Sequence, residues 1–151
     1  MKAATKMASA YLRTGKIYLY PYSRTIKGFW IACEPILVTS ESDETLGEQV
    51  LQTLAKSTEN VPDPESLTAS DSWNSTKALV RAAGVRSYEA FADSAKCVGI
   101  RLDVADVIFT PTLNGGYRRR FLNLKTKIQC QPIEAEVAAS LIAAFEACEY
   151  E

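Results

Sequence analysis

The sequence predicts an α+β fold, with a single antiparallel sheet of about 4–6 strands and about 3–4 helices packed on it. Three observations carry this prediction. Aromatic and aliphatic side chains alternate over residues 16–22, which is the period of a strand. Asn114-Gly115-Gly116 has the composition of a hairpin turn. After Pro132, apolar side chains recur at helical spacing, which predicts a C-terminal helix.

The chain has the size and composition of one folded domain. Its 151 residues are 47% hydrophobic and 23% charged, as in ordinary globular proteins. We therefore expect a single globular domain over residues 1–151, in which residues 1–14 form a flexible N-terminal segment. No apolar run approaches the ~20 residues of a membrane-spanning helix. Lys6 interrupts the apolar stretch that a secretion signal would need, so we expect a cytoplasmic protein.

A hairpin is predicted near the N-terminus. Residues 16–22 form its first strand, and residues 28–38 return as a second strand that Glu34-Pro35 interrupts. One face of the first strand carries three tyrosines, Tyr18, Tyr20 and Tyr22. Such a row either packs under a helix or supplies energy to an interface.

A short amphipathic helix follows the hairpin. Thr45 and Glu48 match a capping box, in which the two side chains satisfy backbone groups at the helix start. Apolar side chains then recur at helical spacing, at Leu46, Val50, Leu51 and Leu54. Residues 57–71 are rich in Pro, Ser, Thr and acids, which predicts an exposed loop.

The second half of the chain predicts two more helices, a strand, a hairpin and the C-terminal helix. Helical patterns cover residues 73–83 and, after Ser87, residues 88–95. Residues 96–103 read as a strand, and the hairpin turning at Asn114 lies within residues 107–124. The apolar stripe of the last helix consists of Ile133, Val137, Leu141, Ile142 and Phe145.

The absence of histidine restricts the chemistry of the chain. Histidine is the commonest general acid or base, the commonest metal ligand and the usual partner of a nucleophile. The cysteines are scattered and form no C-x-x-C pair, at Cys33, Cys97, Cys130 and Cys148. They fit small buried hydrophobes, with a reactive thiol as the alternative. We expect a binding protein and not an enzyme, with no catalytic residue, no metal and no cofactor.

Charge is concentrated in one segment. Residues 41–71 carry eight carboxylates and one lysine, a net charge of −7 in a chain of net charge −1. These acids either face solvent around a helix start and a loop, or meet a basic protein partner. The candidate partner-binding residues are Glu41, Asp43, Glu44, Glu59, Asp63, Glu65 and Asp71.

A basic run provides the alternative function. Residues 117–121 read Tyr-Arg-Arg-Arg-Phe, and cations beside aromatic rings suit a single-stranded nucleic acid. The strand Arg118–Arg120 would then be the binding element of a small nucleic-acid-binding protein. Nucleic-acid modules usually have a basic excess, which this chain lacks, so we expect no direct contact with nucleic acid.

The residue pattern over residues 16–38, followed by the Glu48-Gln-Val-Leu-Gln-Thr-Leu helix, resembles that of immunity proteins of bacterial contact-dependent growth inhibition systems. The resemblance runs over residues 15–149 and rests on no invariant motif. It implies a bacterial toxin inhibitor (CdiI-type) that binds the C-terminal toxin domain of a cognate CdiA-type effector and blocks its active site. Such toxins are often nucleases with basic clefts, which an acidic surface would match. The resemblance assigns no residue a role, and no membrane partner is expected.

Overall fold

The computed structural model describes residues 5–33, 35–62, 69–116 and 120–150, with residues 69–75 described by their backbone alone. Within these ranges the chain forms four helices and nine strands. In chain order they are β1 Lys6–Arg13, β2 Lys16–Arg24, β3 Trp30–Ala32, β4 Leu37–Ser40, α1 Leu46–Ala55, α2 Ala69–Ala83, α3 Tyr88–Asp93, β5 Lys96–Asp103, β6 Asp106–Asn114, β7 Leu122–Asn123, β8 Ile128–Cys130, α4 Glu134–Ala147 and β9 Glu149–Tyr150.

All nine strands belong to one sheet, in the order β3-β2-β1-β5-β6-β7, with β4 also paired to β2 and with β8 and β9 paired to β6. The pairings are antiparallel except for β6 with β9. The predicted α+β class is confirmed, but the predicted 4–6 strands are too few. Apart from β1, the extra strands are two to four residues long, and so short a segment shows no clear alternation.

The expectation that residues 1–14 form a flexible segment is wrong for the part that the structure describes. Residues 6–13 form β1, which pairs with β2 on one side and with β5 on the other. Ala8 and Ala10 are buried on one face of this strand, and Ser9 and Tyr11 are buried on the other. A strand buried on both faces does not alternate between apolar and polar side chains, so its pattern is not diagnostic.

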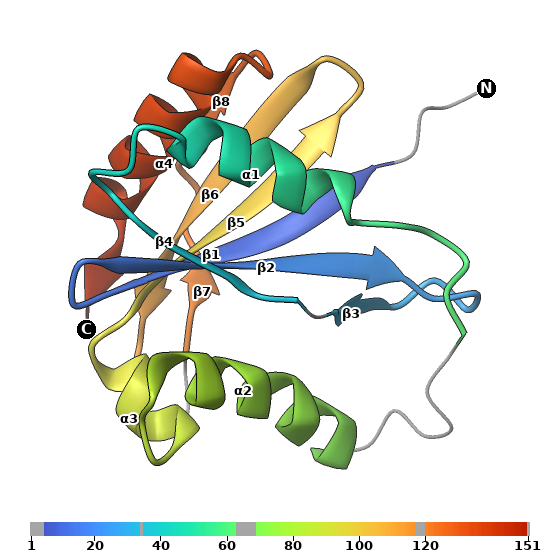
Figure 1. The fold of residues 1–151 in the computed structure, drawn as a ribbon, viewed down its shortest axis with the longest axis vertical. Helices are drawn as coiled ribbons and strands as arrows, with labels where there is room; N and C mark the ends of the chain where they lie inside the picture. Colours follow the sequence, from blue (N-terminus) through green and yellow to red (C-terminus); the bar gives the residue numbers. More distant parts are fainter. Residues whose placement is uncertain (1–4, 34, 63–68, 117–119, 151) are drawn as a thin grey trace.

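Helices cover both faces of the sheet, with α1 and α4 on one side and α2 and α3 on the other (Figure 1). The alternation along β2 distributes its side chains between the two resulting cores. Ile17 and Leu19 pack with α1 and α4, whereas Tyr18 and Tyr20 pack with α2 and α3. The prediction that the tyrosine row packs under a helix is confirmed for these two residues. Tyr22 lies at the end of the row and is only half-buried.

The start of α1 differs from the predicted capping box. Thr45 occupies the N-cap position, but its side chain makes no capping hydrogen bond. Its hydroxyl instead donates to Asp43 Oδ1 at 2.7 Å, and its backbone N–H donates to the same oxygen at 2.8 Å. These bonds lower the pKa of the Asp43 carboxyl. Asp43 therefore organises the turn into α1, which is a structural role for one of the predicted partner-binding acids.

The hairpin predicted to turn at Asn114 also takes a different form. In the structure Leu113 pairs with Leu122, so eight residues separate the paired positions and the turn is not a tight one. Asn114 is 5% exposed, and its amide donates to the carbonyls of Ala92 at 2.8 Å and Ala95 at 3.2 Å. It thereby ties β6 to the end of α3. Residues 117–119 of the predicted strand lie outside the described residues.

The loop predicted at residues 57–71 is shorter than expected. Val61 forms a bridge to Thr25, and α2 already begins at Ala69. The other predicted helices are observed close to their predicted ranges, including α3, whose Ser87 accepts a capping hydrogen bond from the Ala90 N–H. In the ranges that the structure describes, no helix is both long enough and apolar enough to cross a membrane.

The contact between α1 and α4 depends on Gly47. A Cβ atom at this position would lie 1.9 Å from the backbone oxygen of Glu134. Replacing an exposed glycine in a helix with alanine normally stabilises the protein. Here we expect Gly47→Ala to lower the free energy of unfolding by at least about 1–3 kcal/mol, because backbone must move to relieve the overlap.

The measurement for Gly47→Ala is a thermal melt beside Gln52→Ala, an exposed position of the same helix. We expect Gln52→Ala to leave the melting temperature nearly unchanged, and Gly47→Ala to lower it by several degrees, at about 2–4 °C per kcal/mol. A melting temperature of Gly47→Ala equal to or above the wild type would contradict this packing account.

Candidate functional site

The sheet face that carries α2 and α3 is open at one end and forms a groove there. Three rows of side chains cross this face. The first row contains Tyr11 and Cys97 and lies in the core under α2 and α3. The second row is Ser9, Gly99 and Thr110, in register across β1, β5 and β6. These side chains are small, so the sheet surface is low here and a hollow of about 640 Å³ lies above it.

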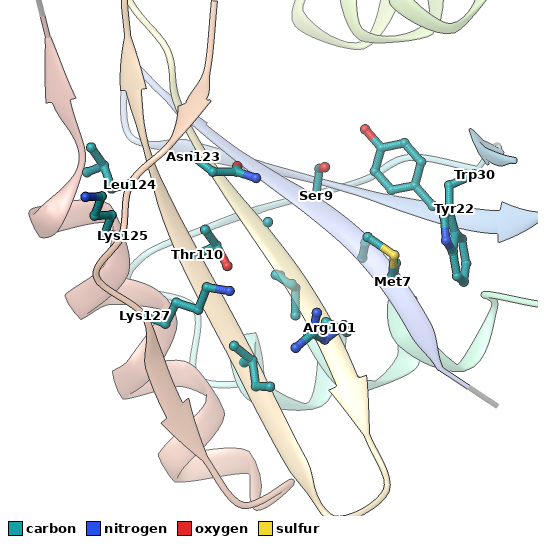
Figure 2. Close-up of a pocket in the computed structure, with 14 residues that line it drawn as sticks. Met7, Ser9, Tyr22, Trp30, Arg101, Thr110, Asn123, Leu124, Lys125 and Lys127 are labelled. Carbon is teal, nitrogen blue, oxygen red and sulfur yellow. The ribbon is translucent and has the colours of Figure 1, made fainter. Parts of the chain in front are cut away.

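The third row and two walls complete the groove (Figure 2). Met7, Arg101 and Ile108 lie side by side in the third row and extend the floor. Tyr22 and Trp30, from β2 and β3, form one wall, and residues 123–127 between β7 and β8 form the other. The groove is thus built by strands from both halves of the chain.

The wall at Trp30 continues into an exposed apolar turn. The turn between β2 and β3 is ordered by hydrogen bonds, since Thr25 N–H donates to the Phe29 carbonyl at 2.7 Å. Ile26 is 67% exposed and Phe29 is 50% exposed on this turn. Large apolar and aromatic side chains of this kind supply much of the energy of protein–protein interfaces.

The groove is cationic. Among the described residues that line it, Arg101, Lys125 and Lys127 are basic and none is acidic. Arg101 rises from the floor, and Lys127 extends over β6 toward the middle of the groove (Figure 2). Asp103 lies 2.9 Å from Arg101 Nε, but this contact lacks hydrogen-bond geometry, and the Arg101 side chain is 43% exposed. Asp103 offsets part of the Arg101 charge, and Lys125 and Lys127 add to the positive charge of the groove.

Tyr22 contributes a neutral phenol to the aromatic wall. Its hydroxyl is hydrogen-bonded to Ser9 and Tyr11, and burial raises its pKa above the ordinary value. The phenol therefore stays protonated at neutral pH. Tyr22 and Tyr20 stack with ring centroids 6.3 Å apart, which joins this wall to the core under α2.

The predicted acidic residues whose side chains the structure describes do not form one cluster. Glu41 and Glu44 are exposed in the turn before α1, next to Asp43. Glu59 follows α1, so the ten residues of this helix, about 15 Å, separate it from the other three. Glu59 lines a small hollow with Arg24 and Lys27. Asp63 and Glu65 lie outside the described residues, as does the side chain of Asp71.

The basic run predicted for nucleic-acid binding loses one of its arginines to the protein interior. Arg120 pairs with Asp93 and donates from Nη1 to Asn114 Oδ1 at 2.9 Å. Its side chain is only 13% exposed. Arg118 and Arg119 lie outside the described residues. Arg120 therefore holds β6 and α3 together and does not present its charge to a phosphate.

Cys97 and Cys148 do not have the properties of reactive thiols. Cys97 is buried, and burial raises its pKa to about 12. Burial also raises the pKa of Cys148. A nucleophilic cysteine needs a lowered pKa, so these two positions have the opposite environment. In the described ranges, no three Cys, Asp or Glu side chains gather closely enough to hold a metal ion.

Sequence reasoning missed the groove, although one signal pointed to it. Glycine inside a strand often marks a place where a ligand or another backbone approaches closely. Gly99 lies within the strand predicted at residues 96–103, and the structure leaves room for a Cβ atom above it, with Thr110 Cβ at 3.9 Å. The remaining lining residues come from separate strands, and their proximity depends on the register of the sheet.

Comparisons with solved structures identify the same fold in two other proteins. A protein of unknown function from Neisseria meningitidis is 18% identical, with a TM-score of 0.82, over 99% of this chain and 98% of the other. A chain of the CdiA-CT/CdiI toxin and immunity complex from Yersinia pseudotuberculosis is 17% identical, with a TM-score of 0.75, over 99% of this chain and all of the other. No family model and no curated protein matches the chain.

The chain therefore shares its fold with a chain of a toxin and immunity complex. The match extends from end to end, so it covers both layers of helices and the sheet between them. At 17–18% identity, the fold is the property that these chains share.

The raised pKa of Cys97 has a measurable consequence for stability. Below pH 9 the thiol is protonated in both the folded and the unfolded state. Between pH 9 and about 12 the unfolded chain loses this proton and the folded chain keeps it, so stability falls as the pH rises. We expect this group to contribute up to about 1.4 kcal/mol per pH unit to the decline.

Urea unfolding of wild type and Cys97→Ala at pH 8 to 10 measures this contribution. The variant should lose stability more slowly with rising pH than the wild type, whatever its stability at pH 8. Parallel curves would show that Cys97 is not the buried neutral thiol of the structure.

Proposed function

We propose that this protein is an immunity protein, which neutralises a CdiA-type toxin domain by forming a tight one-to-one complex that blocks the toxin's active site. The observation that carries the proposal is the fold shared over 99% of the chain with a chain of a toxin and immunity complex. The groove supports it, because it offers aromatic and cationic side chains for a partner.

The proposal needs no chemistry from the protein itself. Inhibition by occlusion requires a stable complementary surface, and the sheet that forms the groove is packed on its opposite face against α1 and α4. Immunity also requires nearly complete occupancy at low cellular concentrations. The dissociation constant should therefore be about nanomolar or below, equivalent to about −12 kcal/mol or stronger.

We propose a nuclease as the class of toxin, and the acidic residues as a steering surface. A nuclease cleft is basic because it holds phosphates, and opposite charges accelerate association. Of the predicted acids with described side chains, Glu41, Glu44 and Glu59 are exposed. These three, with Asp63, Glu65 and Asp71 of the sequence prediction, would attract such a toxin before close contact forms.

Co-expression tests the proposed function directly. The toxin domain of the CdiA-type gene beside this one is induced in a bacterial host, with and without this protein. We expect growth to be restored by the protein, and the two purified chains to elute as a one-to-one complex. The toxin domain of the Yersinia complex is the non-cognate control, which should remain toxic. No rescue and no complex with the neighbouring toxin domain would refute the proposal.

The steering surface is tested by Glu41→Lys with Glu44→Lys, leaving Asp43 to order the start of α1. We expect the double variant to associate with the toxin several-fold more slowly at low salt, with the difference shrinking as salt is raised. Glu146→Lys with Glu149→Lys makes the same charge change at the end of α4 and serves as the control. Equal association rates for both variants would mean that these acids are only solvated.

A further inference from the structure

The inference concerns the partner segment that the groove accepts, and it rests on the proposed function. We infer that the groove binds an acidic segment of the toxin, whose carboxylates meet Arg101 and Lys127 and whose apolar side chain packs on Trp30 and Tyr22. The charge of the groove is opposite to the acidic character that the sequence led us to expect of the interface. The complex would thus have two different contacts. The acidic residues would attract the toxin before close contact forms, and the groove would hold it afterwards.

Charge complementarity is the first argument. Three cations line the described part of the groove without a lining carboxylate, although the whole chain has a net charge of −1. Arg101 is fixed at the floor by its place on β5 and by its contact with Asp103. A carboxylate of a ligand in the groove could contact the Arg101 guanidinium and the Lys127 ammonium group. Both groups form strong charge-assisted hydrogen bonds with carboxylates.

The shape of the floor is the second argument. Ser9, Gly99 and Thr110 lower the sheet surface within the groove. Among the described residues, a Cβ atom at Gly99 would meet only Thr110 Cβ, at 3.9 Å. The hollow of about 640 Å³ can admit several side chains of a peptide segment. Larger side chains in this row would fill the hollow and leave the sheet face flat.

The aromatic wall favours a protein over a nucleic acid. Trp30 and Met7 line the groove, and the exposed apolar side chains of Ile26 and Phe29 lie on the adjoining turn. The arginine of the basic run that the structure describes, Arg120, is buried elsewhere and cannot extend the groove along a phosphate backbone. In its described part the groove thus offers short cationic and apolar contacts and no long basic track.

The test compares binding of the neighbouring toxin domain by full-length variants. Arg101→Glu with Lys127→Glu should weaken the complex at least about tenfold, mainly through faster dissociation. Lys16→Glu with Lys56→Glu makes the same charge change at exposed positions outside the groove and should bind as the wild type does. Arg101→Gln with Lys127→Gln avoids a repulsive contact with Asp103 and should show a smaller loss of the same kind.

A filling variant tests shape separately from charge. Gly99→Val adds volume to the floor in a strand that favours branched residues, so it should melt at or above the wild-type temperature. It should nevertheless bind the toxin domain at least several-fold more weakly. Weakened binding by a variant that melts like the wild type cannot be ascribed to unfolding.

The outcomes separate the inference from the proposed function. If the wild type binds the toxin domain and the folded groove variants bind equally well, the inference is wrong and the proposed function stands. If the wild type does not bind the toxin domain, the proposed function fails, and the inference fails with it. A short glutamate-rich peptide should compete with the toxin, and oligothymidylate should not. Competition by oligothymidylate alone would overturn the inference in favour of a nucleic-acid site.

Discussion

The register of the four long strands is the constraint on which the rest of the structure depends. Because β2, β1, β5 and β6 pair without a slip, their side chains form straight rows across each face. One face is packed against α1 and α4. On the other, α2 and α3 cover the row of Tyr11 and Cys97, and the rows beyond it form the groove. A shift of one residue would exchange the two faces and remove both cores and the groove.

The parts of the fold that could be predicted are those with a regular local signal. The alternation of β2 and the apolar stripe of α4 determine which side each faces, and both were predicted. Asn114 shows where local reasoning fails, because its amide is committed to carbonyls of residues 92 and 95, far away in the sequence. The strand β1 is a second example. Its small side chains show no strand pattern, and their burial results from its pairing with β2 and β5.

The candidate site could be predicted only in part from the sequence, because charged residues that are close along the chain need not lie on one surface. The acids of residues 41–59 are divided by α1, and one of them, Asp43, serves the helix start. In the groove, Arg101 on β5 is 24 to 26 residues away from Lys125 and Lys127, which lie between β7 and β8. These cations therefore do not form a basic run in the sequence. Arg120 is the converse case, since an arginine of a conspicuous basic run pairs with Asp93 and its side chain is only 13% exposed.

The central claim is that a toxin is held in the groove, and amide hydrogen exchange of the protein with and without the neighbouring toxin domain tests it most directly. The account predicts that the complex slows exchange in the segment between β7 and β8, in the turn between β2 and β3, and at the ends of β1 and β5 that line the groove. Slowed exchange confined to α4, or to the turn before α1 with the groove unchanged, would contradict it.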